Sequence, residues 1–153
     1  MINKKCFEDA QSCETDIIRD VEEIKAWLRH RQAQKKLDIV LCDDDPVVIK
    51  ALETACKAAD LAFRSTTSVA ECLNEIQKND IGVLIIDYVL TDGTAVDILE
   101  QKPDMGTGRY PIFVYTDMDM ASLNMDTLCK HQVSLFSKVV SAEELIQYIK
   151  AQL

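Results

Sequence analysis

The spacing of apolar residues changes near position 36. Residues 7–36 lack Gly and Pro, and apolar residues recur there at steps of three and four, which is typical of one amphipathic helix. The regular part of the apolar stripe runs from Ile17 through Val21 and Ile24 to Leu28. Such a stripe is compatible with a homodimer formed through residues 17–28, with a helix packed on its own domain, and with a linker from an upstream domain.

From Leu37 onward, short apolar runs alternate with segments of helical periodicity. The expected strands cover residues 37–42, 61–65, 81–86, 111–115 and 134–137, and the expected helices cover residues 46–59, 68–78, 95–101, 122–130 and 141–152. Pro46 suits the first turn of a helix. The pairs Ser68 with Glu71 and Ser141 with Glu144 have the spacing of capping boxes.

Five strand–helix repeats predict an α/β fold. The strands lack strict alternation of apolar and polar residues, so both of their faces should be buried. Short strand–helix units of this kind form an open, doubly wound parallel sheet of five strands. We therefore expect one such domain over residues 37–153, with residues 1–36 as an extra N-terminal amphipathic helix. Ligands of such sheets bind beyond the carboxyl ends of the strands.

Polar side chains capable of chemistry stand at four of these strand ends. Asp43 and Asp44 follow the first strand, Asp87 the third, Thr116 the fourth and Lys138 the fifth. Carboxylates gathered this closely repel one another unless a cation lies among them, and hard oxygen ligands suit Mg²⁺. A carboxylate can also act as a nucleophile toward a phosphoryl group, while a lysine and a hydroxyl bind its oxygens.

Four segments carry a resemblance to a known family. They are LCDDDP over residues 41–46, LIIDYVLTDGT over 84–94, VYT over 114–116 and FSK over 136–138. The functional positions Asp44, Asp87, Thr116 and Lys138 follow one another at separations of 43, 29 and 22 residues. Over about residues 37–153, the chain closely resembles the receiver domains of bacterial two-component response regulators.

The resemblance implies a flavodoxin-like sheet of strand order 2-1-3-4-5 and a phosphorylated aspartate. Asp87 would be the phosphoacceptor, and Mg²⁺ would be bound by Asp43, Asp44, Asp87 and the main-chain carbonyl of Val89. Thr116 and Lys138 would bind the phosphoryl group.

The donor implied by the resemblance is a sensor histidine kinase or a histidine phosphotransfer protein. The only activities expected are Mg²⁺-dependent self-phosphotransfer and slow autodephosphorylation. No effector domain is expected after the last helix. Output should therefore be a contact with a further protein, a change in dimerisation through the N-terminal helix, or transfer of the phosphoryl group onward. Asp45 is expected to cap the helix that follows it.

Five positions depart from the family pattern. Thr91 stands where a proline is usual, and Ala95 where a glycine is usual. Leu135 occupies the place of the aromatic residue that commonly rotates on activation. Val139 replaces a cis proline, so a trans peptide bond is expected there. Asp117 stands where a small residue is usual.

Two alternatives to a phosphorylated switch arise from the residues. A receiver-like scaffold that never carries phosphate would keep the same fold. The segment Asp92-Gly93-Thr94 also resembles part of the Asp-x-Asp-Gly-Thr motif of haloacid dehalogenase phosphatases. Leu90 occupies the place of the nucleophilic aspartate in that motif, which argues against a hydrolase.

Charge and composition exclude several other classes of protein. The formal net charge is −9, of which residues 1–36 contribute +1 and residues 37–153 contribute −10. Because the predicted domain is this acidic, no nucleic-acid partner is expected. The longest apolar runs are too short to span a bilayer, and no secretory signal is visible, so neither membrane insertion nor export is expected. The six cysteines form no CxxC pair, which is typical of reduced cysteines in a cytoplasmic protein.

Overall fold

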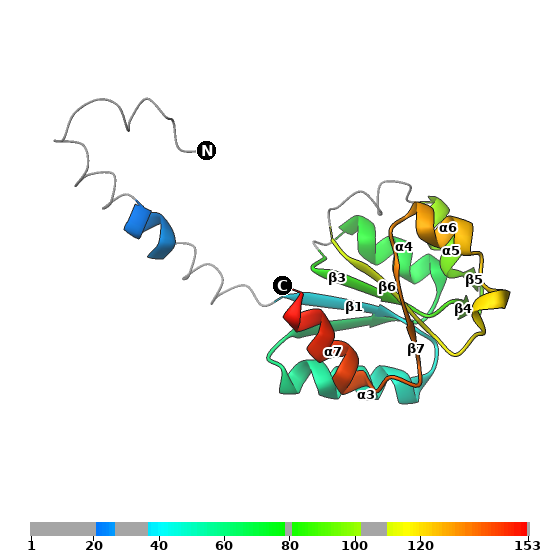
Figure 1. The fold of residues 1–153 in the computed structure, drawn as a ribbon, viewed down its shortest axis with the longest axis horizontal. Helices are drawn as coiled ribbons and strands as arrows, with labels where there is room; N and C mark the ends of the chain where they lie inside the picture. Colours follow the sequence, from blue (N-terminus) through cyan, green and yellow to red (C-terminus); the bar gives the residue numbers. More distant parts are fainter. Residues whose placement is uncertain (1–20, 27–36, 79–80, 102–109, 153) are drawn as a thin grey trace, which may run out of the picture. The chain divides into compact units, whose positions relative to one another are not determined.

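The computed structural model describes residues 21–26, 37–78, 81–101 and 110–152 (Figure 1). It divides into two units, Met1–Lys36 and Leu37–Leu153, which are described separately. Residues 21–26 form a helix on which Ile24 is exposed. The remainder of the helix predicted over residues 7–36, including Ile17 and Leu28, lies outside the described residues.

A five-stranded parallel sheet organises the second unit. Its strands are β1 (Asp38–Cys42), β2 (Ala62–Thr66), β3 (Val83–Ile86), β6 (Ile112–Thr116) and β7 (Ser134–Ser137). They lie in the order β2-β1-β3-β6-β7, and each neighbouring pair is parallel. Counting these five strands alone, the order is 2-1-3-4-5, so the predicted fold class is confirmed.

Helices cover both faces of this sheet. Figure 1 shows α3 (Pro46–Ala58) and α7 (Ala142–Ala151) on one face, and α4 (Val69–Lys78), α5 (Ala95–Gln101) and α6 (Met125–Lys130) on the other. Every residue of the central strands β3 and β6 is buried, as expected for strands covered on both sides.

Each face has its own apolar core. Ile39, Ile85 and Phe113 pack with Leu52 of α3 and Ile146 of α7. The residues that alternate with them point to the opposite face, where Val40, Ile86 and Val114 pack with Ile98 of α5 and Leu128 of α6. The hydrogen bond with Cys42, together with burial in this core, raises the pKa of the Cys72 thiol. Neither cysteine forms a disulfide.

The helix ends follow the sequence signals closely. Asp45 accepts a hydrogen bond from the amide of Val47 at 2.9 Å, so it caps α3 as predicted. Ser141 accepts one from the amide of Glu144 at 3.2 Å and caps α7. No helix among the described residues is long and apolar enough to cross a membrane.

Local structure departs from the expectation at three places. A short antiparallel hairpin, β4 (Val89–Leu90) with β5 (Gly93–Thr94), follows β3 and was not predicted. Strand β3 begins at Val83 rather than at residue 81. The helix expected over 122–130 begins at Met125, because Asn124 caps it and a separate 3-10 turn, η2 (Met120–Ser122), precedes it.

Candidate functional site

The carboxyl ends of the sheet strands bring together the acidic residues that the sequence singled out. Asp43 and Asp44 follow β1, and Asp87 follows β3. One carboxylate oxygen from each of the three lies within 4.8 Å of the others. Asp43 is fully buried, Asp87 is partly buried and Asp44 is exposed. A cluster that is buried on one side and open on the other can admit a small ligand from solvent.

Lys138 reaches this cluster from the end of β7. Its Nζ lies 2.9 Å from Asp43 Oδ2 and 3.2 Å from Asp87 Oδ2. The exposed fractions of the three side chains are 12% for Lys138, 1% for Asp43 and 14% for Asp87. The ammonium therefore neutralises part of the negative charge within a largely desolvated site.

Burial and charge together shift the pKa values of two of these groups. Burial raises the pKa of the Asp87 carboxyl, the charge of Asp43 raises it further, and Lys138 only partly offsets both effects. Burial alone would lower the pKa of Lys138, but the hydrogen bond to Asp43 and the charge of Asp87 outweigh it and raise the pKa. The cluster thus has an excess of negative charge that a further cation would relieve.

The three carboxylates fit a divalent metal ion of the Mg²⁺ type. Asp43 Oδ1 accepts the amide of Asp45 at 2.8 Å, whereas the buried Asp43 Oδ2 is paired with the ammonium of Lys138 at 2.9 Å. Hard carboxylate oxygens facing an open side are the usual protein contribution to a Mg²⁺ site, which keeps several of its waters. The main-chain carbonyl of Val89 stays a predicted ligand.

Thr116 lies beside the cluster at the end of β6. Its side chain is buried, and its hydroxyl oxygen accepts the amide of Met118 at 3.2 Å. The hydroxyl proton is therefore available to another acceptor. The main-chain carbonyl of Thr116 accepts the amide of Lys138 at 3.0 Å, so the backbone joins two of the predicted site residues directly.

The loop that carries Lys138 is attached to the sheet by a residue that the sequence did not single out. Tyr115, buried in β6, donates its hydroxyl to the carbonyl of Val140 at 2.5 Å. The amide of Val140 also bonds to the carbonyl of Ser137 at 3.0 Å. The peptide bond before Val139 is trans, as expected. These bonds hold the loop without the proline usual at this position.

Two further residues fix the loop after Asp87. Asp92 accepts the amides of Val69 at 2.7 Å and Ala70 at 3.2 Å, so it caps α4 from a distant loop. These bonds lower the pKa of its carboxyl. The hydroxyl oxygen of Tyr88 accepts the amide of Asn124 at 2.9 Å. The polar turn that includes Asp92 is visible in the sequence, but nothing there indicates its partner.

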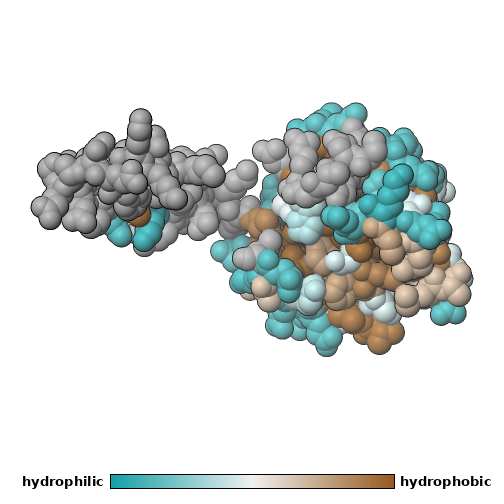
Figure 2. All heavy atoms as spheres, turned by 45° about the horizontal axis from the view of Figure 1, so that its top comes forward, coloured by the Kyte–Doolittle hydropathy of each residue, from teal (hydrophilic) through white to brown (hydrophobic). Residues whose placement is uncertain are grey.

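Exposed apolar side chains follow Asp87 and Thr116 in the loops after β3 and β6. The exposed fraction is 48% for Val89, 36% for Met118 and 61% for Met120, and we call these three residues the methionine rim. Figure 2 shows tan and brown surface at the right-hand side of the domain, where Figure 1 places β4 and β5. Apolar side chains are therefore exposed within four residues of Asp87 and Thr116.

Comparisons with known proteins agree with this arrangement. The family model of the response regulator receiver domain matches residues 39–150. The response regulator protein TodT of Pseudomonas putida is 27% identical over 128 residues, which cover 82% of this chain and 55% of TodT. The response regulator protein TmoT of Ectopseudomonas mendocina is 24% identical over 127 residues, covering 82% of this chain and 56% of TmoT. The chain thus spans about half the length of these relatives.

Solved structures share the fold at low sequence identity. A CheY-like receiver domain protein from Methanospirillum hungatei superposes with a TM-score of 0.68 at 17% identity, covering 77% of this chain and 94% of that one. The chemotaxis response regulator CheY4 of Vibrio cholerae gives 0.67 at 15% identity, covering 78% and 100%. The family match over most of the chain, together with this fold, shows that the chain belongs to the response regulator receiver domain family of two-component signalling.

Proposed function

We propose that the domain is a phosphorylation switch that accepts a phosphoryl group on Asp87. The observation that supports it most directly is the convergence of Asp43, Asp44, Asp87 and Lys138 at one edge of the sheet. In the transfer, an oxygen of Asp87 attacks phosphorus, the bond from phosphorus to the donor's histidine nitrogen breaks, and that nitrogen keeps the electron pair. The product is an acyl phosphate on Asp87.

Each neighbouring group has a proposed role in that step. Lys138 keeps Asp87 ionised despite its raised pKa and then contacts a phosphoryl oxygen. Thr116 donates its free hydroxyl proton to another phosphoryl oxygen. Bound Mg²⁺, held by Asp43, Asp44 and Asp87, would neutralise charge that builds up on the transferred group. The positioned donors thus replace water around the phosphoryl group.

Incubation with acetyl phosphate and Mg²⁺, followed by intact-mass measurement, tests the proposal. The wild-type protein should gain one phosphoryl group, and Asp87→Asn should gain none. Asp119→Asn is a matched control, because Asp119 is an exposed aspartate in the loop after β6, at the same carboxyl edge of the sheet as Asp87. If Asp87→Asn were modified as fully as the wild type, the acceptor assignment would be wrong.

The metal assignment has a separate test. Asp44 is exposed and offers a direct carboxylate to the cluster. Asp44→Ala should therefore abolish Mg²⁺ binding, measured by calorimetric titration of the unphosphorylated protein. Equal affinities in the wild type and Asp44→Ala would remove Asp44 from the ligand set.

The second candidate function is a scaffold that never carries phosphate. The departures at Leu135 and Val139 favour it, because both lie in the strand and loop next to Lys138. Beryllofluoride with Mg²⁺ mimics the phosphoryl group and separates the two functions. A switch should show chemical-shift changes around Asp87 and Thr116, whereas a scaffold should show none.

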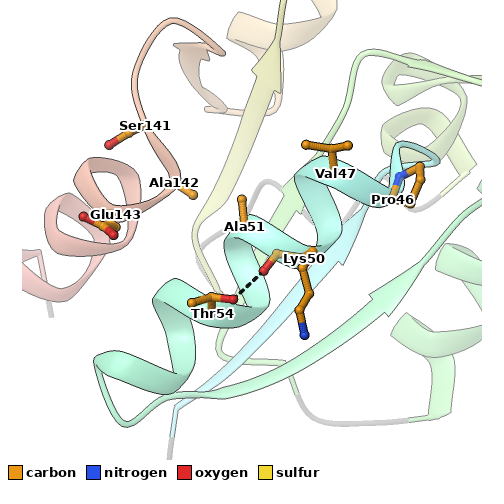
Figure 3. A pocket seen from close by; sticks show the side chains of 8 residues that line it. All are labelled: Pro46, Val47, Lys50, Ala51, Thr54, Ser141, Ala142 and Glu143. Atoms are coloured by element: carbon orange, nitrogen blue, oxygen red, sulfur yellow. Dashed lines mark hydrogen bonds between the residues drawn. The ribbon is translucent and has the colours of Figure 1, made fainter.

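The docking surface that we propose for the phosphodonor is a groove between α3 and α7 (Figure 3). It has a volume of about 660 Å³, and its lining includes Val47, Ala51 and Ala142, with Val47 74% exposed. The groove begins at Pro46, the first residue after Asp43-Asp44-Asp45, and at Ser141, shortly after Lys138. A helical donor seated there would bring its phosphohistidine to the site. Receiver domains interact with histidine kinases or phosphotransfer proteins, and we infer that one of these is the donor.

Transfer kinetics can separate docking from chemistry. Ala51→Glu should slow phosphorylation by a cognate protein donor and leave phosphorylation by acetyl phosphate unchanged, because acetyl phosphate needs no groove. Lys57→Glu, on the same helix but outside the groove, is the control. Equal slowing with both donors would instead indicate damage to the site.

The remaining partner assignments are also proposals. We expect the domain to act in the cytoplasm and to signal to a downstream protein. Because it is acidic, it should not bind nucleic acid. Dimerisation through residues 17–28 stays a prediction, since only residues 21–26 of that segment are described. Light scattering of the full chain and of a chain starting at Lys36 tests it. A dimer for the first and a monomer for the second is expected.

A further inference from the structure

Hydrogen bonds fix the loop that carries Met118 and Met120, two of the three rim residues. In this loop, the amide of Ser122 bonds to the carbonyl of Asp119 at 2.9 Å, and Leu123 is buried beneath the turn. The amide of Asn124 bonds to the Tyr88 hydroxyl at 2.9 Å. The backbone is thus anchored while Met118 and Met120 stay exposed. A fixed loop that presents apolar side chains to water is suited to binding another molecule.

The two segments that carry the rim are acidic. The two segments that carry the rim, residues 87–101 and 116–126, contain seven Asp or Glu residues and no Lys or Arg. Asp117, Asp119 and Asp126 are exposed beside the methionines. An anionic lipid surface, a nucleic acid or a second copy of this acidic chain would be repelled there. A cationic partner would be attracted.

The side chains of the rim favour a partner with an apolar face. Methionine is unbranched and polarisable, so its side chain adapts to the surface that it meets. Aliphatic residues along one side of an amphipathic helix would cover the methionines and Val89, while lysines or arginines on the flanks would meet the aspartates. The domain thus offers both the apolar side chains and the acidic side chains that such a helix would contact.

We propose that the methionine rim is a docking surface for a basic amphipathic helix of a partner protein. The helix would place aliphatic side chains on Val89, Met118 and Met120 and basic side chains beside Asp117 and Asp119. This surface is separate from the groove between α3 and α7, whose lining contains none of the rim residues. The proposal does not depend on phosphorylation of Asp87.

The test uses the full chain and two labelled synthetic helices of about five turns. One has leucines on one face and lysines on the other, and the second has glutamates in place of the lysines. Fluorescence anisotropy at physiological salt should show binding of the leucine–lysine helix only. Increasing salt should weaken that binding.

Charge alone would attract a basic helix to any acidic protein, so the deciding variants keep the charge constant. The double variant Met118→Gln with Met120→Gln should bind the leucine–lysine helix at least about tenfold more weakly. Val139→Gln is the control, because Val139 is 93% exposed and lies outside the rim. Circular dichroism should give the same spectrum for all three proteins.

Other results would overturn the proposal. Equal affinity of the wild type and the double variant would mean that only long-range charge attracts the helix. Binding of the leucine–glutamate helix would exclude a basic partner. Self-association of the wild type that the double variant loses would assign the rim to a second copy of the chain. Failure of both helices to bind would leave the rim without this function.

Discussion

The inner wall of the site, formed by Asp43, Thr116 and Lys138, differs from the methionine rim in burial and in charge. Asp43, Thr116 and Lys138 are largely buried and joined by an ion pair and a backbone hydrogen bond. Val89 and Met118 are exposed, although each lies only two residues beyond Asp87 or Thr116. Burial makes the inner wall sensitive to any change of charge. The rim can vary without loss of the fold, so it is suited to setting partners and rates.

The largest expected effect is on the inner wall. Lys138→Met should lower the free energy of unfolding by about 2–3 kcal/mol in EDTA, because it leaves buried Asp43 without a cation. Urea unfolding measures this, with Lys130→Met at an exposed position as the control. Added Mg²⁺ should restore part of the loss. An unchanged unfolding midpoint would mean that the ion pair contributes no stability.

A smaller effect should appear in the pH dependence of stability. The folded-state pKa of Asp87 lies above its unfolded value, so the folded protein binds more protons in the window between the two values. The free energy of unfolding of the wild type should therefore fall, relative to Asp87→Asn, as pH rises from about 3.9. Without metal, Asp87→Asn should be the more stable protein at neutral pH. Parallel curves for the two proteins would contradict the raised pKa.

Asp92 should contribute less, since its carboxylate is exposed. Asp92→Ala removes two hydrogen bonds at the start of α4 and should lower the thermal midpoint by less than Lys138→Met does. The pKa of Asp92 is lowered in the folded state, so this contribution is present above the unfolded pKa and is lost as pH falls through the folded one. Asp119→Ala is the control, because that side chain makes no capping bond.

The smallest expected effect is on the rim and concerns rate rather than stability. Neither Val89 nor Met118 can orient an attacking water by a hydrogen bond, so self-dephosphorylation should be slow. Met118→Asn should shorten the phosphoryl lifetime about threefold while the free energy of unfolding stays within about 0.5 kcal/mol. Decay of phosphorylated Asp87 after donor removal measures this. A lifetime unchanged by Met118→Asn would separate the rim from the chemistry.

A related prediction concerns Asp117, which follows Thr116 directly, and the rate at which small donors phosphorylate the site. Its exposed carboxylate should repel acetyl phosphate, a small anionic donor, so Asp117→Ala should speed loading by acetyl phosphate. Loading by a docked protein donor should change less, because contacts elsewhere hold that donor. Equal acceleration with both donors would place the effect of Asp117 on the chemical step instead.

The sequence alone determined the fold class and the edge at which the chemistry lies. Strands buried on both faces leave long apolar runs, and parallel strands place their carboxyl ends at one edge. The convergence of Asp43, Asp44 and Asp87 with Lys138 followed from that geometry. The caps at Asp45 and Ser141 were also predictable, because each bonds to an amide within three residues of itself.

The tertiary structure alone decided which distant residues support the site. Asp92 caps a helix that begins 23 residues before it, Tyr115 bonds to a carbonyl 25 residues beyond it, and Tyr88 bonds to an amide 36 residues away. Such contacts leave no periodic signal, because they depend on how packed helices and loops meet after the sheet has formed. The late start of α6 at Met125 has a similar origin, since the preceding turn is held by Asn124 against Tyr88. Local patterns fix elements and their order, whereas side-chain bonds between loops depend on tertiary packing.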